Sequence, residues 1–357
     1  MRLTTLFLPA VLLVCTSQIY GWQINPNPNP ATNTRHVYTD ATNSDEYQQP
    51  FTNNGTINIT SDGTLTNSSD GILINNGTLY NFGTLTNSGG PLTPNTSLTN
   101  NGALYNYFGS TLDNDGAMMK NNLSGTLDNY GTLNNNPGST ASTLANLGTL
   151  NNYSMLINYS GGWLANGFGG QLWNSGEFTN NGTIDTTTGV FVNAGTLNGS
   201  GHIKGKWIDH GKFKPGNAAG AMTIDGDYFK VEGSKEIELG GLLDGGDDKS
   251  LTEFDWIDVT GNVELAGLLN VSLIDGFELH RGNTFEFLRV GGTLTGQYDG
   301  LDEGDLVGNF GGEDLFITYT AGDGNDVALY TNPVPEPTTL LLALLALVAA
   351  PLRVRCG

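Results

Sequence analysis

The sequence has 357 residues, of which only 14% are charged, and its formal net charge is −21. Asn, Gly and Thr replace the missing charged residues, so the composition predicts either disorder or a repeat fold that stacks polar side chains. The acidic surface repels phosphate groups, which argues against nucleic acid as a partner.

Residues 1–21 are typical of a secretory signal peptide. Met1 and Arg2 precede an apolar run of about a dozen residues, which is shorter than the ~20 residues that a membrane-spanning helix needs. An unprocessed anchor and a lipoprotein signal at Cys15 are the alternatives. Residues 22–50 contain the sequence INPNPNP, whose alternating prolines disfavour helix and central strand, and they are expected to form a linker or cap.

Residues 51–200 repeat a short phrase, Gly-Thr-Leu or Gly-Thr-Ile, nine times. We expect Gly at a corner with positive φ, flanked by Asn, followed by a strand of about three residues whose Leu points inward. Such short strands need the equivalent strand of the next coil, with Asn and Thr stacking along the axis. The region is therefore predicted to be a parallel β-solenoid with roughly 18–20 residues per coil. Disorder is the alternative.

Residues 201–331 differ in composition. They contain 24 acidic residues, and Asn falls from 29 residues in 51–200 to six here. Longer alternating stretches such as NVELAGLLNVSL, separated by Asp-Gly, Gly-Gly and Gly-Asn turns, predict antiparallel strands joined by hairpins. We therefore expect an acidic, antiparallel, sandwich-like module or a β cap on the solenoid. The predicted fold class is all-β throughout.

Residues 332–357 combine three features: the motif Val334-Pro335-Glu336-Pro337, an apolar run at 338–352, and the basic pair Arg353 and Arg355. As a helix the run would be about 22 Å long, which is short against a hydrocarbon core of about 30 Å. The run therefore suits transient insertion better than permanent anchoring, and a plain C-terminal anchor is the alternative.

This arrangement resembles the PEP-CTERM sorting signal of bacteria. The resemblance implies an exosortase-type processing enzyme as a partner, transient association with the inner membrane, and a final place at the cell surface or outside the cell, often near exopolysaccharide. Phrases in residues 195–331, such as DWIDVTGNVELAGLLNVSLIDGF, resemble the passenger segment of autotransporter-associated β-helix proteins. That second resemblance implies a surface scaffold with no assigned catalysis.

The residues suggest a binding role more than an enzymatic one. The repeat region has one Lys and no His or Arg, which disfavours a polysaccharide lyase, because a lyase needs a base. A polysaccharide hydrolase needs only two carboxylates, and Asp113, Asp115 and Asp128 are the candidates for it. The favoured hypothesis is a non-enzymatic matrix or adhesion protein, with a passive coat or spacer as a further alternative. Possible sugar-stacking surfaces are Tyr80, Tyr105, Tyr107, Tyr130, Trp163 and Trp173.

No cofactor is predicted. The turn that contains Asp323 and Asp326 is similar to one calcium-binding repeat of the repeats-in-toxin type, but a tight hairpin turn is the favoured interpretation because only one copy is present. The four histidines are dispersed without metal-ligand spacing, and we expect them to be structural or surface residues.

Overall fold

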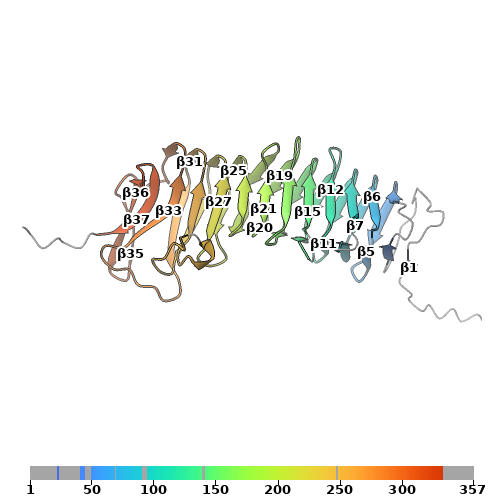
Figure 1. Cartoon of the computed structure of the whole chain (residues 1–357), viewed down its shortest axis with the longest axis horizontal. Helices are drawn as coiled ribbons and strands as arrows, with labels where there is room; N and C mark the ends of the chain where they lie inside the picture. Colours follow the sequence, from blue (N-terminus) through green and yellow to red (C-terminus); the bar gives the residue numbers. More distant parts are fainter. Residues whose placement is uncertain are drawn as a thin grey trace, which may run out of the picture.

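The protein forms a straight rod of three β-sheets (Figure 1). The computed structural model describes residues 22–23, 41–44 and 50–332, apart from residues 69, 91–94, 139–140 and 247. In these ranges every element is a β-strand except one 3-10 helix, η1 (Lys249–Leu251). The predicted fold class is therefore confirmed: a parallel β-solenoid is followed by antiparallel strands. The signal peptide and the sorting signal from residue 333 onward lie outside the described residues.

The strands of the three sheets follow in their spatial order. Sheet A contains β1 (Trp22–Gln23), β2 (Ala41–Ser44), β5 (Thr64–Ser68), β8 (Thr84–Ser88), β11 (Thr111–Asp115), β14 (Thr132–Asn136), β17 (Met155–Asn158), β20 (Glu177–Asn180), β23 (Thr196–Gly199), β26 (Lys212–Pro215), β29 (Ser234–Leu239) and β32 (Leu268–Leu273). Sheet B contains β3 (Phe51–Asn53), β6 (Ile72–Asn75), β9 (Ser97–Asn100), β12 (Met118–Asn121), β15 (Thr143–Asn146), β18 (Trp163–Asn166), β21 (Thr183–Asp185), β24 (His202–Lys204), β27 (Ala221–Asp225), β30 (Trp256–Val259), β33 (Thr284–Val290), β37 (Asp326–Thr331), β36 (Glu313–Ala321) and β35 (Leu306–Phe310). Sheet C contains β34 (Leu294–Gly296), β31 (Val263–Leu265), β28 (Tyr228–Lys230), β25 (Trp207–Asp209), β22 (Val190–Asn193), β19 (Gln171–Asn174), β16 (Thr149–Asn152), β13 (Thr126–Asn129), β10 (Ala103–Asn106), β7 (Thr78–Asn81) and β4 (Thr56–Ile59).

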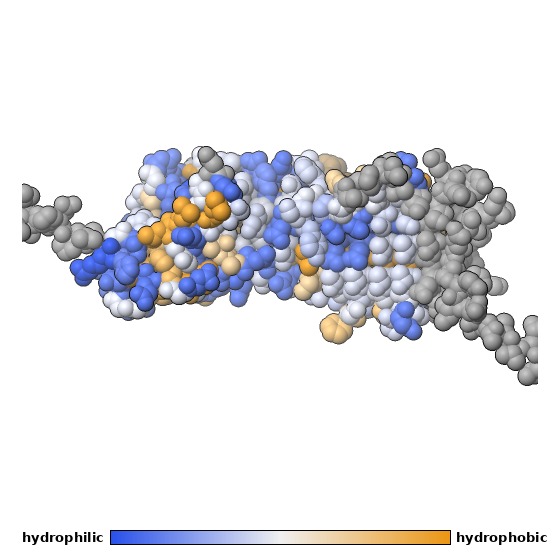
Figure 2. All heavy atoms as spheres, turned by 60° about the horizontal axis from the view of Figure 1, so that its bottom comes forward, coloured by the Kyte–Doolittle hydropathy of each residue, from blue (hydrophilic) through white to orange (hydrophobic). Residues whose placement is uncertain are grey.

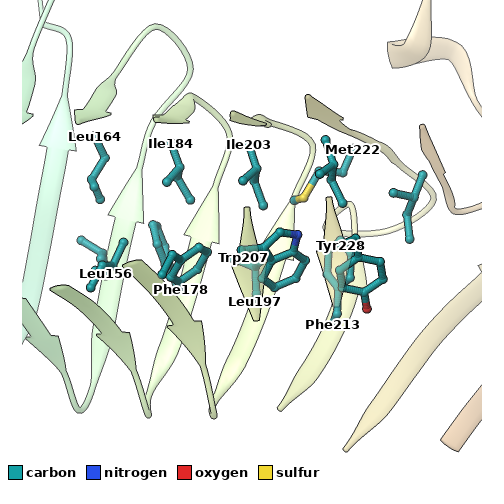
Figure 3. Packing of buried hydrophobic residues seen from close by; sticks show 14 of the residues in the cluster. Leu156, Leu164, Phe178, Ile184, Leu197, Ile203, Trp207, Phe213, Met222 and Tyr228 are labelled. Atoms are coloured by element: carbon teal, nitrogen blue, oxygen red, sulfur yellow. The ribbon is translucent and has the colours of Figure 1, made fainter. Parts of the chain in front are cut away.

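From β3 to β34 the chain visits sheets B, C and A in turn, so each full coil adds one strand to each sheet. Equivalent residues pair along the rod, as where Leu104 lies between Leu79 and Leu127. All three leucines are buried, because alternate residues of a strand point into the rod. Figure 3 shows the resulting columns of inward side chains, such as Leu164 and Ile184 on neighbouring strands of sheet B. The predicted inward Leu ladder is confirmed.

A second inward column consists of asparagines at the ends of the strands. Asn106 accepts a hydrogen bond from Asn81 (2.7 Å), donates to the side-chain oxygen of Asn129 (2.7 Å), and donates its other proton to the carbonyl of Thr132 (2.9 Å). Both amide protons are therefore paired in a fully buried site. We call each such column an asparagine ladder. The sequence indicated stacking of Asn along the axis but placed Asn beside the corner, whereas the alternation that buries Leu also buries the residue two positions later.

Ladders of this kind follow all three sheets. In sheet A the ladder asparagines are 67, 87, 114, 135, 158 and 180, and in sheet B they are 53, 75, 100, 121, 146 and 166. In sheet C they are 81, 106, 129, 152, 174 and 193. The bonds between ladder asparagines all point the same way, from the amide of one coil to the side-chain oxygen of the next coil toward the C-terminus.

The repeat glycines are needed for close packing between coils and not for positive φ. At Gly77 an added Cβ would lie 2.1 Å from the carbonyl oxygen of Gly55, and at Gly102 it would lie 2.1 Å from that of Gly77. Neither Gly77 nor Gly102 has a positive φ. The expectation of a left-handed corner was therefore wrong at these positions, because the backbone of the preceding coil occupies the space that a side chain would fill.

The parallel coils extend further than the sequence indicated. Parallel pairing continues past residue 200 to β34, and in the described part of the chain antiparallel ladders between strands join only β33, β37, β36 and β35 at the C-terminal end. Ladder asparagines in sheet A are 20 to 27 residues apart, from the upper end of the predicted 18–20 to well above it, because the corners accommodate extra residues. The change in composition near residue 200 marks the end of the ladders, not the end of the coils.

Beyond the ladders the interior becomes aromatic and contains buried charge. The last asparagine of the sheet C ladder, Asn193, donates to Asp209 (2.7 Å), whose other carboxylate oxygen lies 2.9 Å from the Nζ atom of Lys230. Tyr228 also donates to this oxygen. Lys235 occupies an inward position of sheet A, is fully buried, and lies with Nζ 3.6 Å from the ring centroid of Phe213. Figure 3 shows Phe213 and Tyr228 in this part of the core.

The Lys235 amine has no hydrogen-bond partner among the described residues, and burial holds its pKa well below the usual value. We expect Lys235→Met to raise the free energy of unfolding at neutral pH by about 1–3 kcal/mol, because it replaces a buried polar group with an apolar one of similar length. In the unfolded state the lysine keeps its proton up to about pH 10.4. Between the lower pKa of Lys235 in the folded protein and this value, the unfolded state binds more protons than the folded state. The free energy of unfolding of the wild type therefore rises with pH in this range.

Denaturant titration at several pH values checks this, with Lys212→Met as the control, since Lys212 is exposed on the same sheet. The difference in the free energy of unfolding between Lys235→Met and the wild type should become smaller toward pH 10. A destabilising effect of Lys235→Met, or an equal effect of Lys212→Met, would contradict the expectation.

Candidate functional site

A cluster of exposed and half-buried aromatic side chains follows the corner between sheets C and A. We call this cluster the aromatic ridge; it consists of Tyr80, Phe82, Tyr105, Tyr107, Tyr130 and Tyr153. Tyr80 and Tyr105 are paired outward residues of β7 and β10. The other four follow directly after ladder asparagines of successive coils, so the ladder sets their spacing along the rod.

The rings of the ridge stack on one another along the rod axis. Phe82 and Tyr107 are almost parallel, with centroids 4.5 Å apart and an interplanar angle of 5°. Tyr130 and Tyr153 are 4.7 Å apart at 11°, and Tyr107 and Tyr130 are 6.1 Å apart at 17°. Each inner ring therefore has its faces turned toward its neighbours, so the ridge presents ring edges and phenol groups to solvent and leaves ring faces open only at its ends.

The structure brings four of the six predicted stacking residues together, namely Tyr80, Tyr105, Tyr107 and Tyr130. Trp173 lies in the same outward row of sheet C as Tyr105, but Asp128 and Asn151 come between them. Trp163 is on β18 of sheet B, where Lys204 lies over its ring at 5.3 Å. The six residues are therefore not one continuous surface.

Phe82 and Tyr153 belong to the ridge although they are not among the predicted stacking residues. The signal was present, because Phe82, Tyr107, Tyr130 and Tyr153 all follow the asparagine that ends a sheet C strand. Aligning the repeats on that asparagine, and not on Gly-Thr-Leu, places the four rings in one column.

The pKa values of two ridge tyrosines, Tyr107 and Tyr130, are raised, so their phenols are protonated hydrogen-bonding groups at neutral pH. Burial raises the pKa of Tyr107, and Tyr80, Tyr105 and Asp128 raise it further. The pKa of Tyr130 is also raised, first by burial and then by Asp128. The ridge therefore offers phenol donors and acceptors beside a carboxylate.

The three carboxylates that are candidates for a hydrolase site do not form one cluster. Asp113 and Asp115 lie on the outward side of β11 in sheet A, as the alternation predicts, but Asp128 lies on β13 in sheet C. Asp113 accepts a hydrogen bond from Asn134 (2.6 Å), and Asp128 accepts one from Asn151 (2.7 Å). Each of these two carboxylates is thus paired with an amide of the next coil.

Asp323 and Asp326 lie at the hairpin between β36 and β37. Asp326 pairs with Ala321 across the hairpin and accepts a hydrogen bond from the backbone N–H of Val290 (2.7 Å), and burial raises its pKa. These contacts attach the turn to the end of β33. Within the described ranges no group of three or more His, Cys, Asp or Glu side chains is placed to hold a metal ion.

Two histidines of the rod have acidic neighbours. His202 lies 3.4 Å from Asp225, and His210 lies 3.2 Å from Glu232. Burial lowers the pKa of His202. His202 is on sheet B and His210 follows β25 of sheet C, so the structure does not bring the two together.

A second exposed apolar region lies toward the C-terminal end. Figure 2 shows apolar atoms gathered there, while the repeat region on the same face is mainly polar or weakly polar. Leu242, Leu243 and Leu251, in the connection between β29 and β30, are each at least half exposed. This connection lies several coils away from the ridge along the rod.

Comparison of the chain with protein-family models, with curated proteins and with solved structures gave no match. Among the described residues, no helix has the length and apolar character that crossing a bilayer requires.

We expect Asp128→Asn to lower the pKa values of Tyr107 and Tyr130, because it removes a negative charge that opposes phenolate formation. Absorbance titration of phenolate measures this, and subtraction of a Tyr130→Phe background isolates Tyr130. Asp113→Asn, on sheet A, is the matched control and should leave both values unchanged. Equal shifts in the two Asp variants would contradict the placement of Asp128 beside the ridge.

Proposed function

We propose that the protein is an exported structural rod of the cell surface or extracellular matrix that binds polysaccharide along its aromatic ridge. The ridge is the observation that supports this most directly, because aromatic rings, phenols and nearby amide and carboxylate groups are the chemistry that sugars require of a binding surface.

The form of the rod suits an extended ligand. Successive coils place equivalent side chains at a regular spacing of about 4.8 Å along each sheet. Repeat folds of this kind provide long binding surfaces in which each unit makes a similar contact. A polymer that lies along the axis would meet the ridge over several coils.

The export and processing part of the proposal depends on the sequence. The signal peptide at residues 1–21 and the motif at residues 334–337, with Arg353 and Arg355, suggest secretion, transient anchoring in the inner membrane, and release by an exosortase-type enzyme. These segments lie outside the described residues.

The enzyme alternative has less support than binding. A hydrolase would need two carboxylates on either side of a sugar chain. Asp113 and Asp115 share one strand, and Asp128 is on a different sheet. A passive coat or spacer remains the alternative if the ridge has no ligand.

The exported protein, purified from its host, should be retained on the polysaccharide that the same cells secrete and should migrate more slowly in gels that contain it. The intact mass of the same preparation should correspond to a chain without Arg353 and Arg355. A heat-unfolded sample is the control for nonspecific retention. Free migration with every polysaccharide would refute the binding role and favour the coat or spacer.

A further inference from the structure

The ridge ends on its N-terminal side at a hollow of about 460 Å³, which is lined by Asn58, Thr60, Tyr80, Phe82 and Tyr107. Asn58 and Thr60 belong to the coil that precedes Tyr80 and Phe82. Asn58 pairs directly with Tyr80 in the register of sheet C, and Thr60 follows Ile59 as Phe82 follows Asn81. The hollow therefore lies where the next rings of the ridge would be if the aromatic column continued.

An open ring face borders this hollow. One face of Phe82 is turned toward Tyr107 at 4.5 Å, so its other face is directed toward the coil of Thr60. Phe82 is 42% exposed, although its ring is stacked on one side. Tyr80 lies beside it, with centroids 6.4 Å apart. Together they form an aromatic wall at the end of the stack.

The rest of the hollow is polar. The amide of Asn58 can donate and accept hydrogen bonds, and so can the hydroxyl of Thr60. An apolar wall with a few polar groups at its edge fits a flat ring that has apolar C–H faces and a rim of hydroxyl groups, which is the form of a pyranose sugar.

The charge around the hollow restricts the class of polysaccharide that can bind there. None of the residues that line the hollow is basic, and Asp128 lies close enough to act on Tyr107 electrostatically. The chain as a whole has a net charge of −21. A polymer of uronic acids, or a sulfated or phosphorylated one, would be repelled on approach.

We infer that the hollow is a subsite for one ring of a neutral polysaccharide, which stacks on Phe82 and Tyr80 and hydrogen-bonds to Asn58 and Thr60. The inference rests on the proposed polysaccharide-binding function and adds the position of the first bound ring and the charge class of the polymer. The remainder of the polymer lies along the phenol edge of the ridge.

Affinity gel electrophoresis of the exported protein tests this with soluble neutral polymers (a β-glucan, a xylan and a mannan) and with polygalacturonate as the anionic probe. At least one neutral polymer should retard the wild type, and polygalacturonate should not. Phe82→Ala should bind that polymer about tenfold more weakly, and Thr60→Val, which keeps the shape of the side chain but removes the hydroxyl, should also weaken binding. Phe168→Ala is the matched control, because Phe168 is 81% exposed and lies outside the ridge. Thermal unfolding of each variant verifies that it is folded.

The outcomes distinguish failure of the subsite from failure of the proposed polysaccharide-binding function. Retention of the wild type with equal retention of Phe82→Ala overturns the subsite and leaves polysaccharide binding intact. Equal losses in Phe82→Ala and Phe168→Ala also overturn the subsite. Stronger retention by polygalacturonate than by every neutral polymer overturns the charge class. If no polymer retards the wild type, the proposed function fails together with the subsite.

Discussion

Most strands of the repeat coils end on a buried asparagine, and the need to pair every polar atom of that side chain connects each such coil to the next. An unpaired buried amide costs on the order of 1–3 kcal/mol, so a single unpaired position is a serious defect in a rod this narrow. Asparagine meets the need because its oxygen accepts from the preceding coil, while its two amide protons reach the next asparagine and a backbone carbonyl, as at Asn106. Leucine columns provide apolar burial, but they do not specify register along the axis as tightly as this hydrogen-bond pattern does.

The bonds of each ladder all run toward the C-terminus, so the last asparagine of a ladder needs a different acceptor. The sheet C ladder ends on the carboxylate of Asp209, which then pairs with Lys230. The sheet A ladder ends at Asn180, because β23 has Gly199 where the next asparagine would lie, and Asn180 keeps its bond to a backbone carbonyl, that of His202. Beyond these points Trp207, Phe213 and Tyr228 fill the interior, and hydrophobic burial takes over from the amide bonds. The aromatic ridge depends on the same ladders, because its four corner rings directly follow ladder asparagines and so share their spacing.

The sequence predicts the solenoid because the Gly-Thr-Leu phase is regular enough to place the inward leucines. The predicted place of asparagine beside the corner and the predicted positive φ of the repeat glycines are wrong, because both residues are common in turns for reasons unrelated to packing between coils. Asn135 is inside the rod since it lies two residues after Leu133, and Gly77 is required by the carbonyl of Gly55. Past residue 200 the repeat loses its asparagines, so the composition conceals coils that keep the same pairing, such as Asn193 with Asp209. Of the candidate site, the tyrosines that follow asparagine could be predicted, whereas the stacked geometry that covers their faces depends on ring orientations that no sequence pattern encodes.

Two neighbouring asparagines on β14 test the central role of the ladder most directly. Asn135 points inward, accepts from Asn114 and donates to Asn158 and to the carbonyl of Trp163, whereas Asn134 points outward and donates to Asp113. Denaturant titration should show that Asn135→Ala lowers the free energy of unfolding by about 2–4 kcal/mol, because it leaves buried partners unpaired. Asn134→Ala should lower it by less than about 1 kcal/mol. Equal losses in the two variants, or a larger loss in Asn134→Ala, would contradict the account.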